Sequence, residues 1–140
     1  MKKLILSLIA VFIFSFSFSQ SKTVEKKEPQ LNSKKAIEYL KKELRLKGSK
    51  LKTVEDAYNK YVINMVKLNE QIAMKDKSSA GNSEALVSNK QAKFKMMNAF
   101  LKERDAAATK GFSKGELGKY QKFSRAIHPF TLQVKPAKKK

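Results

Sequence analysis

Residues 53–72 read TVEDAYNKYVINMVKLNEQI, and this stretch carries the strongest periodic signal in the chain. Its large apolar side chains recur at alternating spacings of four and three residues, which places them along one face of a helix. A narrow apolar seam of this kind packs lengthwise on another helix, as in helical bundles and coiled coils. The stretch therefore predicts a long helix whose seam is formed by Val54, Tyr58, Tyr61, Met65, Leu68 and Ile72.

A helix is also expected on the N-terminal side of this seam. Apolar side chains recur at helical spacing from Ser33 onward, and Lys47 followed by Gly48 is typical of a helix end. The preceding residues 20–32 are polar, charged and interrupted by a proline, which indicates a flexible leader. We therefore expect the first helix to start near Ser33 and the seam helix to start at Thr53, whose hydroxyl can cap it.

Two helices are expected after the seam. Residues 75–83, KDKSSAGNS, predict a turn, and Ser83 can cap a third helix with a broad apolar face. Gly111 is expected to end that helix. Ser113 has the partner for a capping box in Glu116, which predicts a fourth helix that runs to about Ile127.

These patterns together predict the fold class. No alternation of apolar and polar residues competes with the helices, apart from the brief TLQV at residues 131–134. We expect an all-α chain of three to four helices, with a long antiparallel helical hairpin and shorter flanking helices. The expected organisation is a signal peptide at residues 1–19, a leader at 20–32, a helical domain at 33–130 and a basic tail at 131–140.

The first 19 residues have the order of an export signal. Lys2 and Lys3 precede an apolar run at residues 4–18, and serines stand at positions minus three and minus one of a cut after Ser19. The run of 15 residues is shorter than the roughly 20 that span a bilayer. We therefore expect cleavage near Ser19, a periplasmic or secreted protein, and no membrane-spanning segment after cleavage.

The charge of the expected mature chain points to an acidic partner. Loss of Lys2 and Lys3 leaves 29 basic against 12 acidic residues, a net charge of +17. Because charge of this size destabilises a compact chain by self-repulsion, it favours a partner that is an acidic protein or a polyanion. A face that serves solubility is the alternative interpretation of the lysines.

Few residues in the sequence could carry catalysis or bind a metal. The chain has no cysteine and a single histidine, so we expect neither a disulfide framework nor a zinc site. No set of nucleophile, base and orienting group is apparent, and no glycine-rich phosphate loop follows a strand. We therefore expect a protein that is not an enzyme and that has no cofactor and no metal.

The start of the fourth predicted helix carries a family resemblance. Residues 112–123, FSKGELGKYQKF, resemble the LTxxQ motif that occurs twice, at helix starts, in the Spy/CpxP group of periplasmic stress proteins. In this resemblance Phe112 stands for Leu, Ser113 for Thr and Glu116 for Gln. Lys119, Tyr120 and Gln121 match a continuation that many members of the group have.

A second, weaker copy of the motif lies at the start of the seam helix. There Thr53 is kept, Asp56 stands for Gln, and Lys52 stands for Leu. The two copies suggest a pseudo-repeated hairpin; two ordinary capping motifs are the alternative. The resemblance spans about residues 40–127 and implies a curved helical hairpin that dimerises into a cradle. It also implies that the basic and apolar concave surface of this cradle binds unfolded proteins without ATP.

The candidate binding residues lie on the second and third predicted helices. Lysines seven residues apart can form a positive stripe on each helix, and two methionines can add apolar contacts to clients. We expect the partners to be unfolded or acidic proteins. An extracytoplasmic polyanion-binding or adhesion protein, for nucleic acid, lipopolysaccharide or another anionic polymer, is the alternative function. The candidate client- or anion-binding residues are Lys60, Lys67, Lys95, Lys102, Met96 and Met97.

Overall fold

The computed structural model describes the backbone of residues 23–136 and the side chains of residues 28–136. The predicted signal peptide, residues 1–19, lies outside the described residues, as do residues 137–140 of the predicted basic tail. No helix in the described range is both long enough and apolar enough to cross a membrane.

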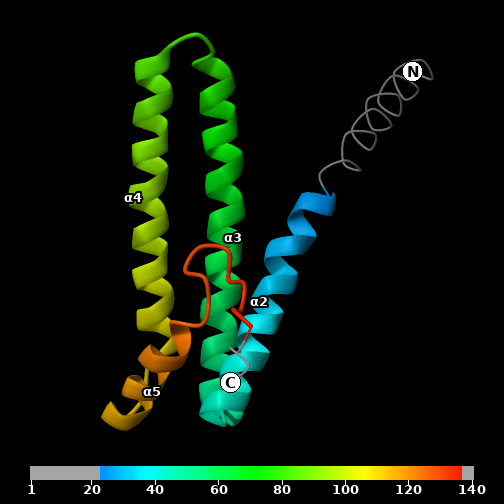
Figure 1. Cartoon of the computed structure of the whole chain (residues 1–140), viewed down its shortest axis with the longest axis vertical. Coiled ribbons are helices and arrows are strands. Elements are labelled where there is room, and N and C mark those ends of the chain that lie inside the picture. Colours follow the sequence, from blue (N-terminus) through cyan, green and yellow to red (C-terminus); the bar gives the residue numbers. More distant parts are fainter. Residues whose placement is uncertain (1–22, 137–140) are drawn as a thin grey trace, which may run out of the picture.

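A long antiparallel hairpin of two helices dominates the molecule (Figure 1). Its helices are α3, Gly48–Ser78, and α4, Ser83–Ala108, which lie side by side and are joined by a short turn. The flanking helices are α2, Thr23–Leu44, and α5, Lys114–Ser124; α2 packs on α3 and also contacts α5. The predicted all-α fold class, with a long hairpin and shorter flanking helices, is confirmed, and residues 23–136 contain no strand.

Helix α2 begins earlier than the sequence predicted. It starts at Thr23 rather than near Ser33, so residues 23–32 of the predicted flexible leader are helical. Pro29 lies inside the helix, where its missing N–H removes one backbone hydrogen bond close to the helix start. Ser33 and Ala36 are fully buried on the side of α2 that enters the core. Residues 28–32 are themselves half-buried or exposed, so the helix extends N-terminally from turns that are anchored in the core.

Helix α3 also begins earlier, so the prediction of Thr53 as its N-cap is wrong. The helix starts at Gly48, and the Thr53 hydroxyl donates a hydrogen bond to the Ser49 carbonyl within the helix, at 2.8 Å. Asp56 forms an ion pair with Lys52 instead of taking part in a cap. The second motif copy is therefore not at a helix start, and the predicted pseudo-repeat of two helix starts is wrong.

The physical reason lies in the turn between α2 and α3 and in a contact with α5. Arg45 and Gly48 both have positive φ angles, 53° and 54°, which reverse the chain within a few residues. The buried Leu46 anchors this turn in the core. Lys50, in the first turn of α3, forms an ion pair with Glu116 of α5 at 2.6 Å. These contacts between distant segments fix the helix start ahead of Thr53.

The start of α4 lies close to its predicted position. The N-cap is Asn82 rather than Ser83, and its side-chain oxygen accepts a hydrogen bond from the Ala85 N–H at 3.1 Å. Glu84 lies in the first turn, as expected from the favourable interaction of an acidic side chain with the helix dipole. The sequence therefore located this helix to within one residue.

The capping box at the start of α5 is confirmed. The Ser113 hydroxyl accepts a hydrogen bond from the Glu116 N–H at 3.3 Å, and the Glu116 carboxylate accepts one from the Ser113 N–H at 2.8 Å. The helix ends at Ser124 rather than at Ile127 because the chain turns back there. Leu117 is 38% exposed, whereas Tyr120 is buried.

The segment after α5 folds back onto the molecule as a loop, residues 125–136, which we call the C-terminal loop. Backbone hydrogen bonds join His128 to Gln133 and Lys135 to Ala126, at 2.7 and 2.8 Å. Leu132 belongs to the predicted basic tail, but it is 2% exposed and lies in the core, so that part of the prediction is wrong. Its burial removes apolar surface from water, which a solvated tail could not do.

The main core lies where α2, α3, α5 and the C-terminal loop meet. Most residues of the predicted seam are part of it, and α4 adds a small residue. Its largest members are Ile37, Leu40, Leu46, Val54, Tyr58, Tyr61, Val62, Met65, Tyr120, Ile127 and Leu132.

Candidate functional site

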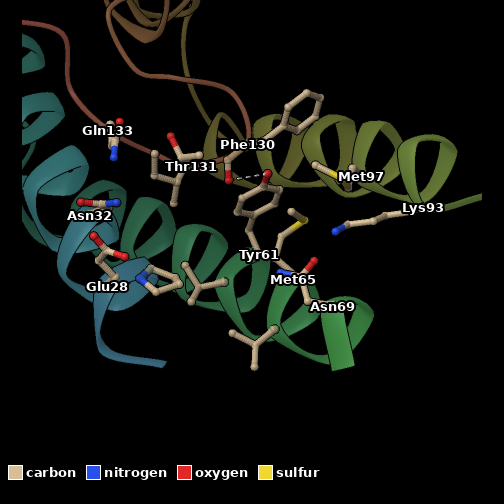
Figure 2. Close-up of a pocket in the computed structure, with 14 residues that line it drawn as sticks. Glu28, Asn32, Tyr61, Met65, Asn69, Lys93, Met97, Phe130, Thr131 and Gln133 are labelled. Atoms are coloured by element: carbon tan, nitrogen blue, oxygen red, sulfur yellow. Dashed lines mark hydrogen bonds between the residues drawn. The ribbon is translucent and has the colours of Figure 1, made fainter. Parts of the chain in front are cut away.

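A groove of about 370 Å³ opens between four segments of the chain (Figure 2). Its walls come from the N-terminal half of α2, the middle of α3, the middle of α4 and the C-terminal loop. The α3 side chains recur at positions 62, 65, 66 and 69, the spacing that places them on one helix face. The groove is lined by Glu28, Pro29, Asn32, Tyr61, Val62, Met65, Val66, Asn69, Lys93, Met97, Phe130, Thr131, Leu132 and Gln133.

The floor of the groove is apolar. Val62 and Met65 of α3 and Leu132 of the C-terminal loop are buried, while Val66 and Met97 are half-buried. Methionine side chains adapt their shape to different apolar partners. The floor can therefore accept apolar side chains without demanding one particular shape.

Polar side chains border this floor. Amide groups come from Asn32 of α2, Asn69 of α3 and Gln133 of the C-terminal loop, and Thr131 adds a hydroxyl. Amides both donate and accept hydrogen bonds, so they can pair with either group of a peptide backbone. The groove thus combines an apolar floor with hydrogen-bonding groups along its border.

Lys93 brings a positive charge into this groove. The side chain extends from α4 into the groove and is half-buried (Figure 2). No described side chain forms an ion pair or a hydrogen bond with Lys93. Glu28 also lines the groove, but it belongs to α2 and lies on the opposite side. Because partial burial removes water from an ammonium group, an anionic partner at this end would be favourable.

Two aromatic residues form a rim beside the groove. The rings of Phe94 on α4 and Phe130 in the C-terminal loop meet edge to face, with centroids 6.0 Å apart. Phe94 is 59% exposed although its ring has this contact. The Phe130 and Thr131 N–H groups donate hydrogen bonds to Nδ1 of His128, at 3.3 and 3.1 Å, which hold the loop turn in shape.

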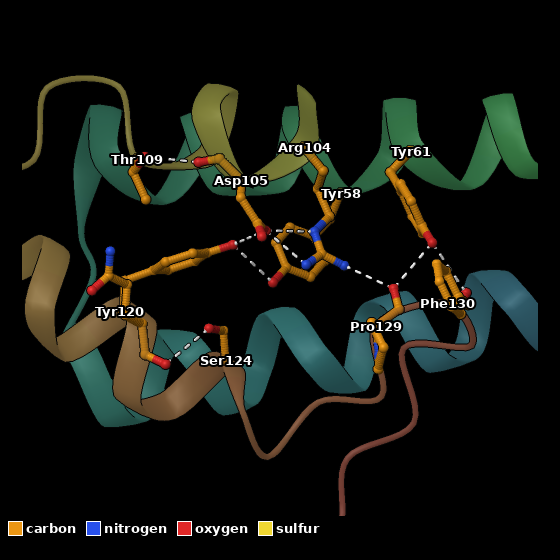
Figure 3. A network of polar contacts seen from close by, with 10 residues as sticks. Tyr58, Tyr61, Arg104, Asp105, Thr109, Tyr120, Ser124, Pro129 and Phe130 are labelled. Atoms are coloured by element: carbon orange, nitrogen blue, oxygen red, sulfur yellow. Dashed lines mark hydrogen bonds and ion pairs between the residues drawn. The ribbon is translucent and has the colours of Figure 1, made fainter. Parts of the chain in front are cut away.

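A buried polar network fastens the C-terminal loop to the hairpin (Figure 3). The Arg104 guanidinium lies between the rings of Tyr58 and Tyr61, 4.8 and 5.1 Å from their centroids. It forms an ion pair with Asp105 at 2.7 Å and donates a hydrogen bond to the Pro129 carbonyl at 3.2 Å. A guanidinium suits this place because it stacks on aromatic faces and keeps its donors in plane.

Tyrosine hydroxyls complete the network. Tyr61 donates to the Pro129 carbonyl at 3.0 Å, and Tyr120 donates to the Asp105 carboxylate at 2.8 Å. Burial raises the pKa of Tyr61 to about 12, although the nearby Arg104 charge opposes the rise. Burial also raises the pKa of Tyr120. Both hydroxyls therefore stay protonated at neutral pH and keep donating the hydrogen bonds that hold the groove wall.

The structure places the sequence-predicted site residues on different surfaces. Met97 lines the groove, whereas Met96 is 42% exposed and does not line it. Lys60 forms an ion pair with Glu103 of α4 at 2.6 Å and lines a separate, much smaller pocket. Lys67, Lys95 and Lys102 are exposed and, among the described residues, have no ion-pair partner. These lysines and methionines therefore do not form one site.

Lys93, the rim residue Phe94 and the loop residues that line the groove were not among the residues predicted from the sequence. Val62 and Val66 stand beside the seam rather than on it, and their valine side chains were the available signal for a second contact face. Lys93 resembles the other lysines of its helix in the sequence. Its special position arises from the α2 and loop segments that come to lie beside it.

The positions of possible metal ligands bear on whether the protein can bind a metal ion. Within residues 28–136, no group of three or more histidine, cysteine, aspartate or glutamate side chains is placed to hold a metal ion.

Comparison of the chain with protein-family models, with curated proteins and with solved structures finds no match.

Proposed function

We propose that this protein is an exported, ATP-independent binding protein that holds unfolded or acidic client proteins through apolar side chains on a basic helical surface. The observation that carries the proposal is the exposure of apolar side chains on α4. This helix of 26 residues buries Arg104 and Ala108, whereas Val87 and Phe94 are 54% and 59% exposed.

Exposure of this kind has a physical cost that a binding function explains. Each Å² of apolar surface left in water forgoes about 25 cal/mol of stabilisation. Val87 and Phe94 are seven residues apart and so lie on one face of α4, and α3 adds the exposed Ile63 and Met74 elsewhere on the hairpin. Exposed apolar side chains that share a helix face are available to contact a partner protein.

The charge of the chain supports the choice of client. The whole sequence has a net charge of +19, and the helices that carry the exposed apolar side chains also carry exposed lysines, among them Lys67, Lys95 and Lys102. Mutual repulsion keeps such molecules apart in solution, which protects an apolar surface from self-association. The same charge attracts acidic segments of unfolded proteins. Independence from ATP follows from the Spy/CpxP resemblance and from the lack of a phosphate-loop motif in the sequence.

Light scattering of a denaturing client protein tests this function. The chain from Gln20 to Lys140 is added at equimolar and higher ratios, without nucleotide, at low and near-physiological salt. A folded protein of equal charge serves as the control for non-specific electrostatic effects. We expect suppression of scattering that persists at the higher salt and exceeds the control. No suppression, or suppression equal to the control, would sink the proposal.

A polyanion-binding function is a second candidate, favoured by the exposed lysines that have no ion-pair partner among the described residues. If the protein binds polyanions, we expect it to be retained on heparin or DNA, and we expect this retention to fall steeply with salt because the affinity comes from counterion release. Removal of residues 135–140 should weaken that retention. Retention that is insensitive to salt would argue against this candidate.

A further inference from the structure

We propose that the groove binds an extended polypeptide segment whose apolar side chains lie on the groove floor and whose carboxylate pairs with Lys93. The inference rests on the proposed function, because it assigns a site and a segment chemistry to client binding. The juxtaposition that carries it is a half-buried lysine, with no partner among the described residues, at one side of an apolar floor.

The size and lining of the groove fit a few apolar side chains. Its volume of about 370 Å³ falls within the range of roughly 300–1,000 Å³ that is typical of ligand pockets. Val66 and Met97 are half-buried and face the open space, so an occupant would remove their remaining apolar surface from water. The exposed ring of Phe94 beside the groove can cover one more side chain.

Charge selects the chemistry at the two sides of the groove. Lys93 on α4 attracts a carboxylate, and Glu28 on α2, across the groove, attracts a basic group (Figure 2). Lys93 is half-buried, so water screens its ion pair with a partner less than it screens a pair with the exposed Glu28. The two opposite charges would therefore bind a segment in one orientation, with its acidic end at Lys93.

The border of the groove favours a polypeptide over an anionic lipid. Asn32, Asn69, Thr131 and Gln133 offer donors and acceptors along the open space. The backbone of an extended segment can pair with these groups, whereas an alkyl chain would cover them without forming hydrogen bonds. An occupant that covers these groups without pairing with them binds less tightly, so the lining favours a peptide backbone.

Fluorescence anisotropy with a defined peptide tests the inference. The probe is a labelled ten-residue peptide with a central Leu-Val-Phe, a lysine near one end and a glutamate near the other. We expect Lys93→Glu to weaken its binding by about tenfold, the effect of losing one charge-assisted contact. The matched control is Lys119→Glu, which makes the same charge change at an exposed lysine of α5, outside the groove. It should change binding by less than about twofold, since its interaction with the peptide is screened.

An exchange of the two charges distinguishes loss of the ion pair from loss of the fold in Lys93→Glu. A second peptide, with lysine in place of the glutamate, should bind Lys93→Glu more tightly than it binds the unmodified protein. Rescue of this kind requires a folded groove and a direct pairing at position 93. Equal weakening by Lys93→Glu and Lys119→Glu, or no rescue, would overturn the inference.

Two further arms separate the occupant and the function. If dodecanoate binds in a manner that depends on Lys93 while the peptide does not bind, the groove is a lipid site and the inference fails. If light scattering shows client protection but the peptide binds the unmodified protein and Lys93→Glu with equal affinity, the proposed function stands and the groove assignment fails. If the peptide binds through Lys93 but no client is protected, the groove assignment stands and the proposed function fails.

Discussion

Arg104 lies at the junction between the hairpin and the C-terminal loop, near the C-terminal end of α4, a helix that otherwise buries only Ala108. Its side chain is 4% exposed, and its charge is balanced by Asp105, two tyrosine rings and a backbone carbonyl. A buried guanidinium is tolerated because each of these groups faces it. The residue therefore links the position of the groove wall to the stability of the fold.

We expect Arg104→Met to lower the free energy of unfolding by about 2–3 kcal/mol, because it removes the charge that pairs with the Asp105 carboxylate and one of the two side-chain donors to the Pro129 carbonyl. The value lies below that of a fully buried pair because Asp105 is 41% exposed. Urea unfolding followed by circular dichroism measures it. Lys102→Met, on the exposed face of the same helix, is the control and should change stability by less than about 0.5 kcal/mol. A loss below about 1 kcal/mol for Arg104→Met would contradict the assigned role.

Glu116 makes stability depend on pH. Its hydrogen bonds with Lys50 and with the Ser113 N–H lower the pKa of its carboxyl to about 2, from an ordinary value of 4.5. Because the folded-state pKa is depressed, the stabilisation is fully present above pH 4.5 and is lost as the pH falls toward 2. The stability difference between the unmodified protein and Glu116→Gln should therefore shrink across that window. Thermal unfolding at pH 6, 4 and 2.5 measures the difference; one that stays constant would refute the assignment.

At the scale of the element, α5 contains two glycines that lower the stability of the helix, and other contacts of α5 compensate for this loss. A Cβ atom added at Gly115 or Gly118 would meet no heavy atom within 4 Å. The capping box and the ion pair from α3 hold the helix start, and the buried Tyr120 holds its middle. The glycines are therefore not required by packing within the described structure.

Gly115→Ala and Gly118→Ala should each raise the free energy of unfolding by about 0.5–1 kcal/mol, because alanine restricts the unfolded chain more than glycine does. Thermal or urea unfolding provides the measurement. Gly111→Ala is the control with the opposite sign, because Gly111 has a φ of 83°, where a side chain is strained. Destabilisation by either helical alanine would indicate a contact at this face.

The same scale explains which helix ends could be predicted. Ser113 and Glu116 form a complete local signal, and the structure has the capping box there. Thr53 and Asp56 offer a similar pattern, but the Lys50 contact with Glu116 and the turn at Arg45 fix the start of α3 upstream. The second signal failed because distant residues decide that helix start.

At the scale of the whole molecule, the hairpin was predictable and the groove was not. All six residues of the predicted seam are buried. They could be predicted because apolar residues at helical spacing mark the helix face that packs on neighbouring elements. The groove is lined in part by α2, which is helical on both sides of Pro29. It is also lined by Leu132, which follows a proline in a basic segment. Neither segment has a periodic pattern that would predict its place.

The whole molecule also combines two properties that usually conflict. It carries a large positive charge, and it leaves apolar side chains of α4 in contact with water. A purely electrostatic binder has no need of exposed Val87 and Phe94, and a helix that serves only the fold gains stability when such side chains are buried. The proposed function therefore assigns these two side chains to client recognition.

Light scattering of a denaturing client with the double variant Val87→Ser and Phe94→Ser tests that assignment most directly. Both side chains are more than half exposed, so the replacements should leave the helical fold intact, which circular dichroism checks. We predict that the unmodified chain suppresses aggregation at near-physiological salt and that the double variant loses most of this suppression at unchanged net charge. Equal suppression by the two proteins, or suppression that disappears with salt in both, would contradict apolar recognition by this hairpin.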